Sequence, residues 1–150
     1  MSFGGKPTTL VDCTIPNDGF WPDLELAEFQ ASYRLPAEYL PEMMVEGLTL
    51  AMGEVNLDLA KRKAEWQDMG YKYLEGSGME LESFYLASYR RAAYCRAKSF
   101  LLQQFATVNR RESAENLGKE APERHELFLS YSQQSVRVLQ GRGRVTAELL

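Results

Sequence analysis

PAEYLPEMMVEGLTLAMGEVNLDLAKRKAEWQDMG, residues 36–70, carries the clearest helical pattern in the chain. Its apolar residues recur at spacings of three, four or seven, as on one face of an α-helix. Pro41 is tolerated in the first turn of a helix, and Gly70 suits a left-handed C-terminal cap. The sequence predicts one helix from about Pro36 to Asp68, roughly 45 Å long. The predicted stripe comprises Leu40, Met44, Gly47, Ala51, Val55, Leu59 and Trp66, and is widened by Met43, Leu50 and Leu57.

Three further segments on either side of this stretch have helical patterns. Asp23, after Phe20-Trp21-Pro22, predicts a cap for a short helix over Leu24 to Arg34. Broad apolar faces predict two more helices, over Leu81 to Asn109 and Pro122 to Gln140. No segment alternates long enough for a strand, except that Val145 to Leu150 would form one by pairing with another element. The predicted fold class is all-α, an antiparallel helical bundle with extended N-terminal and C-terminal arms.

The two ends of the chain have a different composition from the helices. Residues 1–19 are rich in glycine and proline, and we expect them to be irregular. The last ten residues, GRGRVTAELL, follow a helix that Gly141 ends, and they span roughly 30 Å when extended. Such a terminus is either a frayed end or an arm for a partner. We therefore expect an N-terminal arm over 1–22, a helical domain over 23–140 and a C-terminal docking arm over 141–150.

The charge is unevenly distributed along a chain whose net charge is −4. Residues 1–82 hold 15 acidic and 6 basic side chains, whereas residues 83–150 hold 6 acidic and 11 basic side chains. This asymmetry favours either head-to-tail contact between identical subunits or pairing of the two halves within one chain. For contact between subunits, the candidate interface residues are Arg90, Arg91, Arg110 and Arg111.

Searches for catalytic, metal and cofactor motifs find no pattern, so we predict a protein that is not an enzyme and needs no cofactor. The sequence has one histidine, His125, and lacks the Glu-x-x-His pair of a di-iron bundle because position 122 is proline. The distant Cys13 and Cys95 cannot form a zinc tetrad and are expected to be free thiols, with Cys95 a small buried residue. No secretory leader or membrane-spanning apolar run is recognisable, which predicts synthesis in a cytoplasm and no membrane partner.

Basic clusters leave a second function open, a cytosolic helical module that binds nucleic acid through its second half. These clusters are Lys61-Arg62-Lys63, Arg90-Arg91 with Arg96 and Lys98, and Arg110-Arg111. They are also explained by a solvated helix face or by ion pairs with nearby glutamates. Aromatic residues do not interleave with them as on a single-strand-binding surface.

Several sequence blocks occur in an order that resembles a known family. These blocks are Phe20-Trp21-Pro22-Asp23, the GLTLAMGEVNL core within Gly47 to Trp66, Met69-Gly70-Tyr71, Phe84-Tyr85, Arg91-Ala92-Ala93-Tyr94-Cys95, and Gln140-Gly141 with the basic, then apolar, tail. Together they resemble the head completion/stabilisation protein (gpL) family of peduovirus-type contractile-tailed phages, over about residues 20–150.

The resemblance implies a structural part of the virion neck, made in the cytoplasm of a bacterial host. Such proteins are connector adaptors: twelve identical copies form a ring beneath the portal, extend the DNA channel and give the tail a platform. The partners implied are the portal ring, identical subunits, and tail terminator or neck proteins, while packaged DNA passes through non-specifically. The C-terminal segment is implied to dock on the portal. The candidate portal-binding residues are Arg142, Arg144, Val145, Thr146, Leu149 and Leu150.

Overall fold

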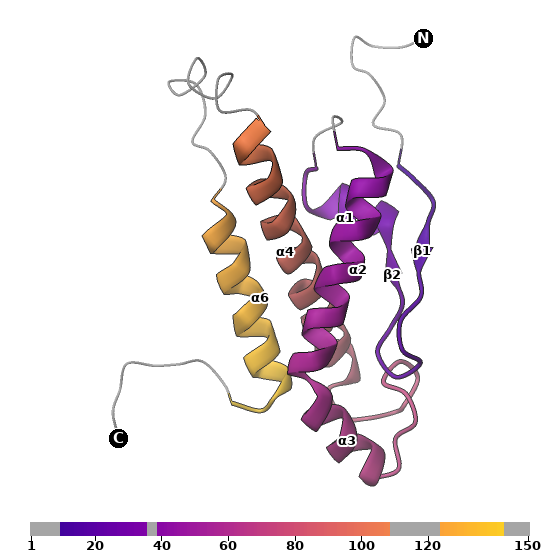
Figure 1. Ribbon diagram of the computed structural model, residues 1–150. Coiled ribbons are helices and arrows are strands. Elements are labelled where there is room, and N and C mark those ends of the chain that lie inside the picture. The colour runs from indigo at the N-terminus through magenta and orange to yellow at the C-terminus, as the bar shows by residue number, and fades with distance from the viewer. Residues whose placement is uncertain (1–9, 36–38, 109–123, 143–150) are drawn as a thin grey trace, which may run out of the picture.

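The computed structural model describes residues 10–35, 39–108 and 124–142, and helices dominate this part of the chain (Figure 1). A two-stranded antiparallel sheet joins β1 to β2 near the N-terminus, with Thr14 opposite Glu25 and Ile15 opposite Leu24. The elements are β1 (Thr14–Ile15), β2 (Leu24–Glu25), α1 (Leu26–Ser32), α2 (Pro41–Asp58), α3 (Ala60–Asp68), α4 (Glu82–Val108) and α6 (His125–Leu139). Because α4 packs against both α2 and α6 and runs antiparallel to each, the predicted all-α antiparallel arrangement is confirmed.

The predicted helix over 36–68 is two helices, and this part of the prediction is wrong. Leu59 ends α2 with φ −101° and ψ 8°, and α3 starts at Ala60. No proline or glycine marks the break in the sequence. At the bend, both Leu59 and Trp66 are buried, at 0 % and 3 % exposure. Burial of these two side chains offsets the loss of regular helix geometry, since each removes a large apolar surface from water.

The stripe on α2 is also narrower than predicted. Met44, Ala51 and Val55 face the core and are almost completely buried. Leu50 and Leu57 are instead 55 % and 78 % exposed, so their assignment to the buried face is wrong. Leu50 lines a shallow groove between α2 and α4 and is not packed into the core.

The N-terminal region is more ordered than the sequence predicted. Thr14 and Ile15 form a strand, which corrects the expectation that residues 1–19 are irregular. Leu24 and Glu25 pair with that strand, so α1 begins at Leu26 rather than at Leu24. The side chain of Asp23 does not cap this helix; its Oδ1 accepts a hydrogen bond from the backbone N–H of Asn17, at 2.8 Å.

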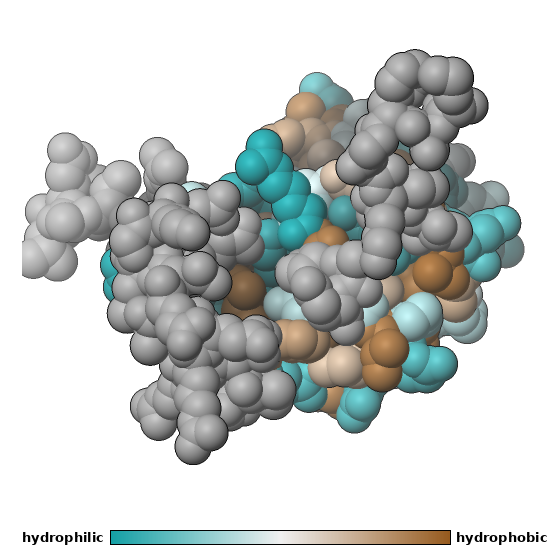
Figure 2. Space-filling view, turned by 90° about the horizontal axis from the view of Figure 1, so that it is seen from above, coloured by the Kyte–Doolittle hydropathy of each residue, from teal (hydrophilic) through white to brown (hydrophobic). Residues whose placement is uncertain are grey.

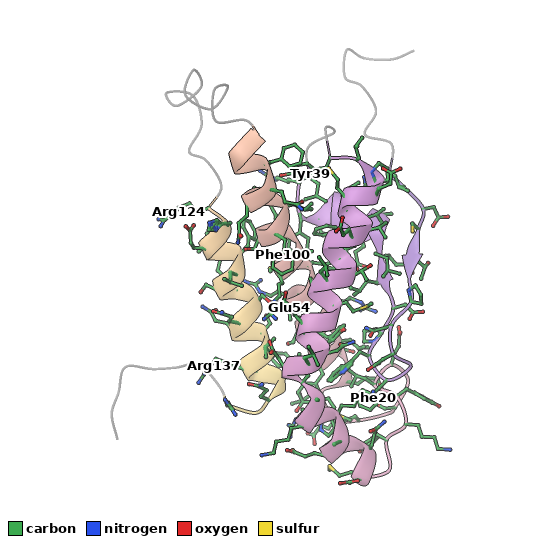
Figure 3. The ribbon with its side chains drawn as sticks, viewed as in Figure 1. Phe20, Tyr39, Glu54, Phe100, Arg124 and Arg137 are labelled. Atoms are coloured by element: carbon green, nitrogen blue, oxygen red, sulfur yellow. The ribbon has the colours of Figure 1, made fainter. Side chains whose placement is uncertain are left out.

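An aromatic cluster holds this region to the lower end of α4 (Figure 3). Trp21 stacks on Tyr89 with ring centroids 4.9 Å apart, and Trp66 lies 5.0 Å from Tyr85. Phe20, labelled in Figure 3, packs edge-on against Trp21 at 5.0 Å. The core therefore includes residues from within 1–22, the range assigned to an N-terminal arm.

The turn before Trp21 is fixed by polar contacts. Asp18 Oδ1 accepts the backbone N–H groups of Phe20 and Trp21, and Asp18 Oδ2 pairs with Lys63 at 2.9 Å. Burial alone would raise the pKa of Asp18, but these hydrogen bonds and the lysine charge hold it below its usual value. The ionised carboxylate thus ties the turn to α3.

Candidate functional site

The C-terminal end of α6 is a well-defined helix terminus. Gly141 has φ 76°, a left-handed conformation that glycine adopts without a steric penalty. The N–H of Gly141 donates to the carbonyl of Val138 at 3.0 Å, and the N–H of Arg142 donates to the carbonyl of Arg137 at 2.9 Å. These two bonds form a Schellman motif, which confirms the predicted stop at Gly141. The backbone is therefore well defined up to Arg142, the last residue that the structure describes.

This exit point lies beside the junction of α2 and α3, as Figure 1 shows. Gln140 Nε2 donates to the backbone carbonyl of Asp58 at 2.8 Å. The Arg62 guanidinium lies next to Gly141, and its other side stacks over the Trp66 ring, 4.7 Å from the centroid. The end of α6 is thus attached to the same bend that buries Trp66.

A polar link in the middle of α6 joins three helices. Arg96 on α4 is only 5 % exposed, and its Nε donates to Ser132 Oγ of α6 at 3.1 Å. Its Nη1 lies 3.0 Å from Asp58 Oδ2 and 3.6 Å from Glu54 Oε1, both on α2. Ser132 Oγ in turn donates to the carbonyl of Ala92 at 2.6 Å. These contacts fix the register of α6 relative to α4, since each needs a particular pair of atoms.

Only part of the predicted interaction residues fall in the described chain. Arg142 is exposed directly after the helix cap. Of the predicted subunit-interface residues, Arg90 pairs with Glu75 of the same chain, at 3.6 Å between Nη2 and Oε1. Arg91 is exposed, and its guanidinium lies 4.8 Å from the centroid of the Tyr131 ring. The predicted residues Arg144, Val145, Thr146, Leu149, Leu150, Arg110 and Arg111 lie outside the described residues.

A basic, aromatic-lined pocket, which sequence reasoning missed, lies between α1, α4 and α6. Its volume is about 330 Å³. We call it the basic pocket and define it by Tyr33, Arg34, Arg91, Lys98, Phe128 and Tyr131. The only sequence signal for it was the spacing of Arg91, Cys95 and Lys98, which places them on one face of a helix.

Lys98 and Arg96 correct the reading of the basic clusters as solvated faces. Lys98 is 3 % exposed; its Nζ donates to the carbonyl of Tyr33 and lies 4.6 Å from the centroid of the Phe128 ring. Arg96 forms the ion pairs with α2 carboxylates described above, which confirms the alternative of pairing with nearby acids. Both cations are largely withdrawn from solvent, so they contribute little to a surface for nucleic acid.

Burial raises the pKa values of three tyrosines, Tyr33, Tyr89 and Tyr94, and of one cysteine in the described chain. Burial raises the pKa of the Cys95 thiol above its usual value, although a hydrogen bond with Tyr33 opposes the shift. Cys95 is 2 % exposed, which confirms its assignment as a small buried residue. Burial likewise raises the pKa of Tyr94 to about 12. A thiol with a raised pKa is a poor nucleophile near neutral pH.

The described residues contain neither a cluster of metal ligands nor a helix that could span a membrane. Within that part of the chain, His, Cys, Asp and Glu side chains nowhere gather in threes as a metal site would require. None of the helices described there combines the length and apolarity needed to cross a bilayer.

On the face shown in Figure 2, hydrophobic residues reach the surface in small groups between hydrophilic ones.

Comparison with known proteins gives a consistent result across nearly the whole chain. The profile of the family described as phage head completion protein (GPL) matches residues 15–150. A relative described as a probable head completion/stabilization protein, from Haemophilus phage HP1 (strain HP1c1), is 28 % identical over 151 residues, which cover 99 % of each chain. No solved structure matches the chain significantly.

Proposed function

Because this chain belongs to the phage head completion protein family, a structural component of the virion rather than a known class of enzyme, we propose that it is a neck adaptor. In this proposal, identical copies, twelve in the arrangement that the sequence resemblance implies, form a ring beneath the portal. The ring extends the channel through which packaged DNA passes and gives the tail terminator or neck proteins a platform.

The observation that carries the proposal is the way in which α6 ends. A Schellman motif and the bond from Gln140 to Asp58 fix the point from which the last eight residues leave the helical body. In sequence those residues combine Arg144 with the apolar Val145, Leu149 and Leu150. Arginines pair with carboxylates and apolar side chains fill pockets, so this segment has the chemistry to dock on another protein.

A ring of copies increases the strength of such docking. Each segment binds the portal alone through only a few contacts. Once one copy is seated, the neighbouring segments are held close to their own sites, and this effective concentration strengthens the whole assembly. The proposal divides the chain into a helical domain and a C-terminal docking arm over 141–150. The helical domain includes Ile15, Phe20 and Trp21, which lie in the range first assigned to an N-terminal arm.

The test compares full-length protein with a chain truncated after Arg142, which retains the helix cap. We expect the truncated protein to keep its helical circular dichroism and lose attachment to purified portal rings. A matched variant, Arg144→Gln with Leu150→Gln, should weaken attachment in the same direction without shortening the chain. Undiminished attachment of the truncated chain would refute the docking role, and a large loss of helicity would place the segment in the core.

A second control addresses the surface on the portal. Portal rings whose tail-side surface has been altered should lose binding to the full-length protein. Equal binding to altered and unaltered rings would contradict the proposal. Strong, salt-dependent retention of short DNA duplexes, with no binding to portal, would instead favour the nucleic-acid module.

A further inference from the structure

The outer face of α2 is both apolar and acidic. Glu42, Glu46, Leu50, Glu54 and Leu57 lie within about a third of a turn of one another around the helix. We call these five residues the α2 ridge. Its leucines are 55 % and 78 % exposed. Glu54 pairs with Arg96 of the same chain, whereas Glu42 and Glu46 form no ion pair with a cation in the described part of the chain. The described chain leaves this helix face incompletely buried, and exposed leucines beside carboxylates are typical of a surface that contacts another protein.

The basic pocket has complementary properties. Arg34 and Arg91 form no ion pair with any carboxylate in the part of the chain that the structure describes. None of the residues lining the pocket is acidic. Phe128 and Tyr131 give it an aromatic wall, against which an aliphatic side chain packs well. The pocket therefore suits a ligand that presents carboxylates beside leucines.

The two surfaces lie on opposite flanks of the α4–α6 hairpin. On α4 the pocket is lined by Arg91, Cys95 and Lys98. The groove beside the ridge is lined by Phe100, Gln103 and Gln104, together with Glu46 and Glu54 of α2. At 3.6 residues per turn the two sets on α4 point roughly 160° apart. In Figure 3, Glu54 and Phe100, which line this groove, both lie between α2 and α6.

We propose that the α2 ridge of one copy docks in the basic pocket of the next copy. This inference rests on the proposed ring and specifies the contact that builds it. Glu42 and Glu46 of the ridge pair with Arg34 and Arg91, while its leucines cover the rings of Phe128 and Tyr131. Since the two surfaces differ and lie on opposite flanks, each copy uses both at once. Such head-to-tail contacts propagate, and they close into a ring when the rotation between copies permits.

The shape and chemistry of the pocket favour this partner over a nucleic acid. Its cations converge on one concave site of about 330 Å³ rather than following a line of phosphates along an exposed face. The chain itself carries the complementary ligand, because the ridge has three carboxylates and exposed leucines. The acidic first half and basic second half of the sequence are thereby matched between neighbours.

A charge-exchange experiment tests the pairing on portal rings. The pocket variant is Arg34→Glu with Arg91→Glu, and the ridge variant is Glu42→Lys with Glu46→Lys. Each variant alone should reduce the number of copies bound per portal ring by about tenfold at a fixed protein concentration. An equal mixture of the two should recover binding, because in an alternating ring reversed pockets meet reversed ridges and native pockets meet native ridges. Native mass spectrometry counts the copies directly.

Matched controls separate the pairing from general effects of charge and folding. Lys61→Glu and Glu80→Lys change exposed charges outside both surfaces and should leave the copy number unchanged. Leu57→Ser removes one exposed apolar side chain of the ridge without changing its charge, and it should lower the copy number without affecting unfolding.

The outcomes distinguish this inference from the proposed function. If wild-type protein does not accumulate on portal rings, the adaptor proposal fails. If wild-type protein accumulates but the single-surface variants accumulate equally, or their mixture does not recover, the ridge–pocket pairing is wrong and the adaptor proposal stands. Loss of DNA-duplex binding in the pocket variant, with unchanged copy number, would assign the pocket to nucleic acid and overturn the pairing.

Discussion

The two sides of α4 are held by different kinds of contact. Toward α3 and the N-terminal region, the contact is aromatic, with Trp21 stacked on Tyr89 and Trp66 against Tyr85. Toward α6, the buried contact combines apolar and polar residues. Val136 and Leu139 of α6 are buried beside Ser132 and Ser135, and Ser132 forms hydrogen bonds with Arg96 and with the carbonyl of Ala92 on α4.

The two kinds of contact have different consequences for the stability of the fold and for the positions of the helices. Aromatic burial is strong but non-directional, so it holds the helices together without fixing their exact register. Hydrogen bonds are weaker in net free energy but directional, so they specify which atoms meet. The α6 side therefore sets the positions of Gly141 and Arg142 at the end of the helix, whereas the aromatic side buries the large rings of Trp21, Trp66 and Tyr89.

The largest loss of stability is expected from a substitution in the aromatic cluster. Trp21→Ala should lower the free energy of unfolding by about 3–5 kcal/mol, because a large buried side chain is lost and a cavity remains. Urea unfolding followed by circular dichroism measures this change. Phe84→Ala, at a position that is 50 % exposed, serves as the control and should cost far less. Equal effects at the two positions would show that the aromatic cluster is not the main source of stability.

The second-largest loss of stability is expected at Arg96, which links three helices through polar contacts. Arg96→Met keeps most of the side-chain volume but removes the bonds to Ser132 and Asp58. We expect a loss of about 1–3 kcal/mol, since the arginine is buried and bonded to charged partners. Hydrogen exchange should speed up in α6 more than in α2. Arg124→Met, at an exposed position, is the control; uniform acceleration in all helices would contradict a positioning role for Arg96.

A smaller effect is expected when only the hydroxyl on α6 is removed. Ser132→Ala should cost about 1 kcal/mol, because its bond to the carbonyl of Ala92 is lost and Arg96 Nε loses its acceptor. Denaturant unfolding of this variant beside Gln133→Ala, an exposed neighbour, gives the comparison. A Ser132→Ala variant as stable as wild type would mean that the hydrogen bonds across this contact contribute no net stability.

The smallest loss of stability is expected at Asp18, which fixes the turn before Trp21, and this loss depends on pH. The pKa of Asp18 is lower in the folded protein than its ordinary value of 3.8. A lowered folded pKa contributes stability above the unfolded pKa, and this contribution is lost as the pH falls through the folded pKa. Asp18→Asn should therefore cost less than about 1 kcal/mol at pH 7 and nothing measurable well below pH 3. Unfolding curves at both pH values measure the difference in stability between wild type and Asp18→Asn. A difference that grows on acidification would contradict the predicted pH dependence.

The sequence predicted the elements whose signals are local. Regular spacing of apolar residues correctly located α4 and most of α2 and α6. Gly70 and Gly141, both with positive φ, ended helices where predicted, because left-handed caps depend on glycine itself. The predicted start of the last helix at Pro122 was wrong in part, since Arg124 has an extended backbone and α6 begins at His125.

The features that were missed depend on contacts between distant segments. Two-residue strands are too short to show alternation, so β1 and β2 left no pattern. Neither the bend at Leu59 nor the exposure of Leu57 has a local cause. The burial of Lys98 depends on a carbonyl of α1 and a ring of α6. The basic pocket was missed for the same reason, because it forms only where α1, α4 and α6 meet.

The most direct test of the adaptor proposal is a reconstruction of the portal vertex in assembled phage heads containing this protein. The account predicts that the helical body lies below the portal and that residues 143–150 contact portal subunits. It also predicts that these residues diverge from α6 just after the cap at Gly141. Finding residues 143–150 packed against the α4–α6 hairpin of their own chain, with no contact to the portal, would contradict it.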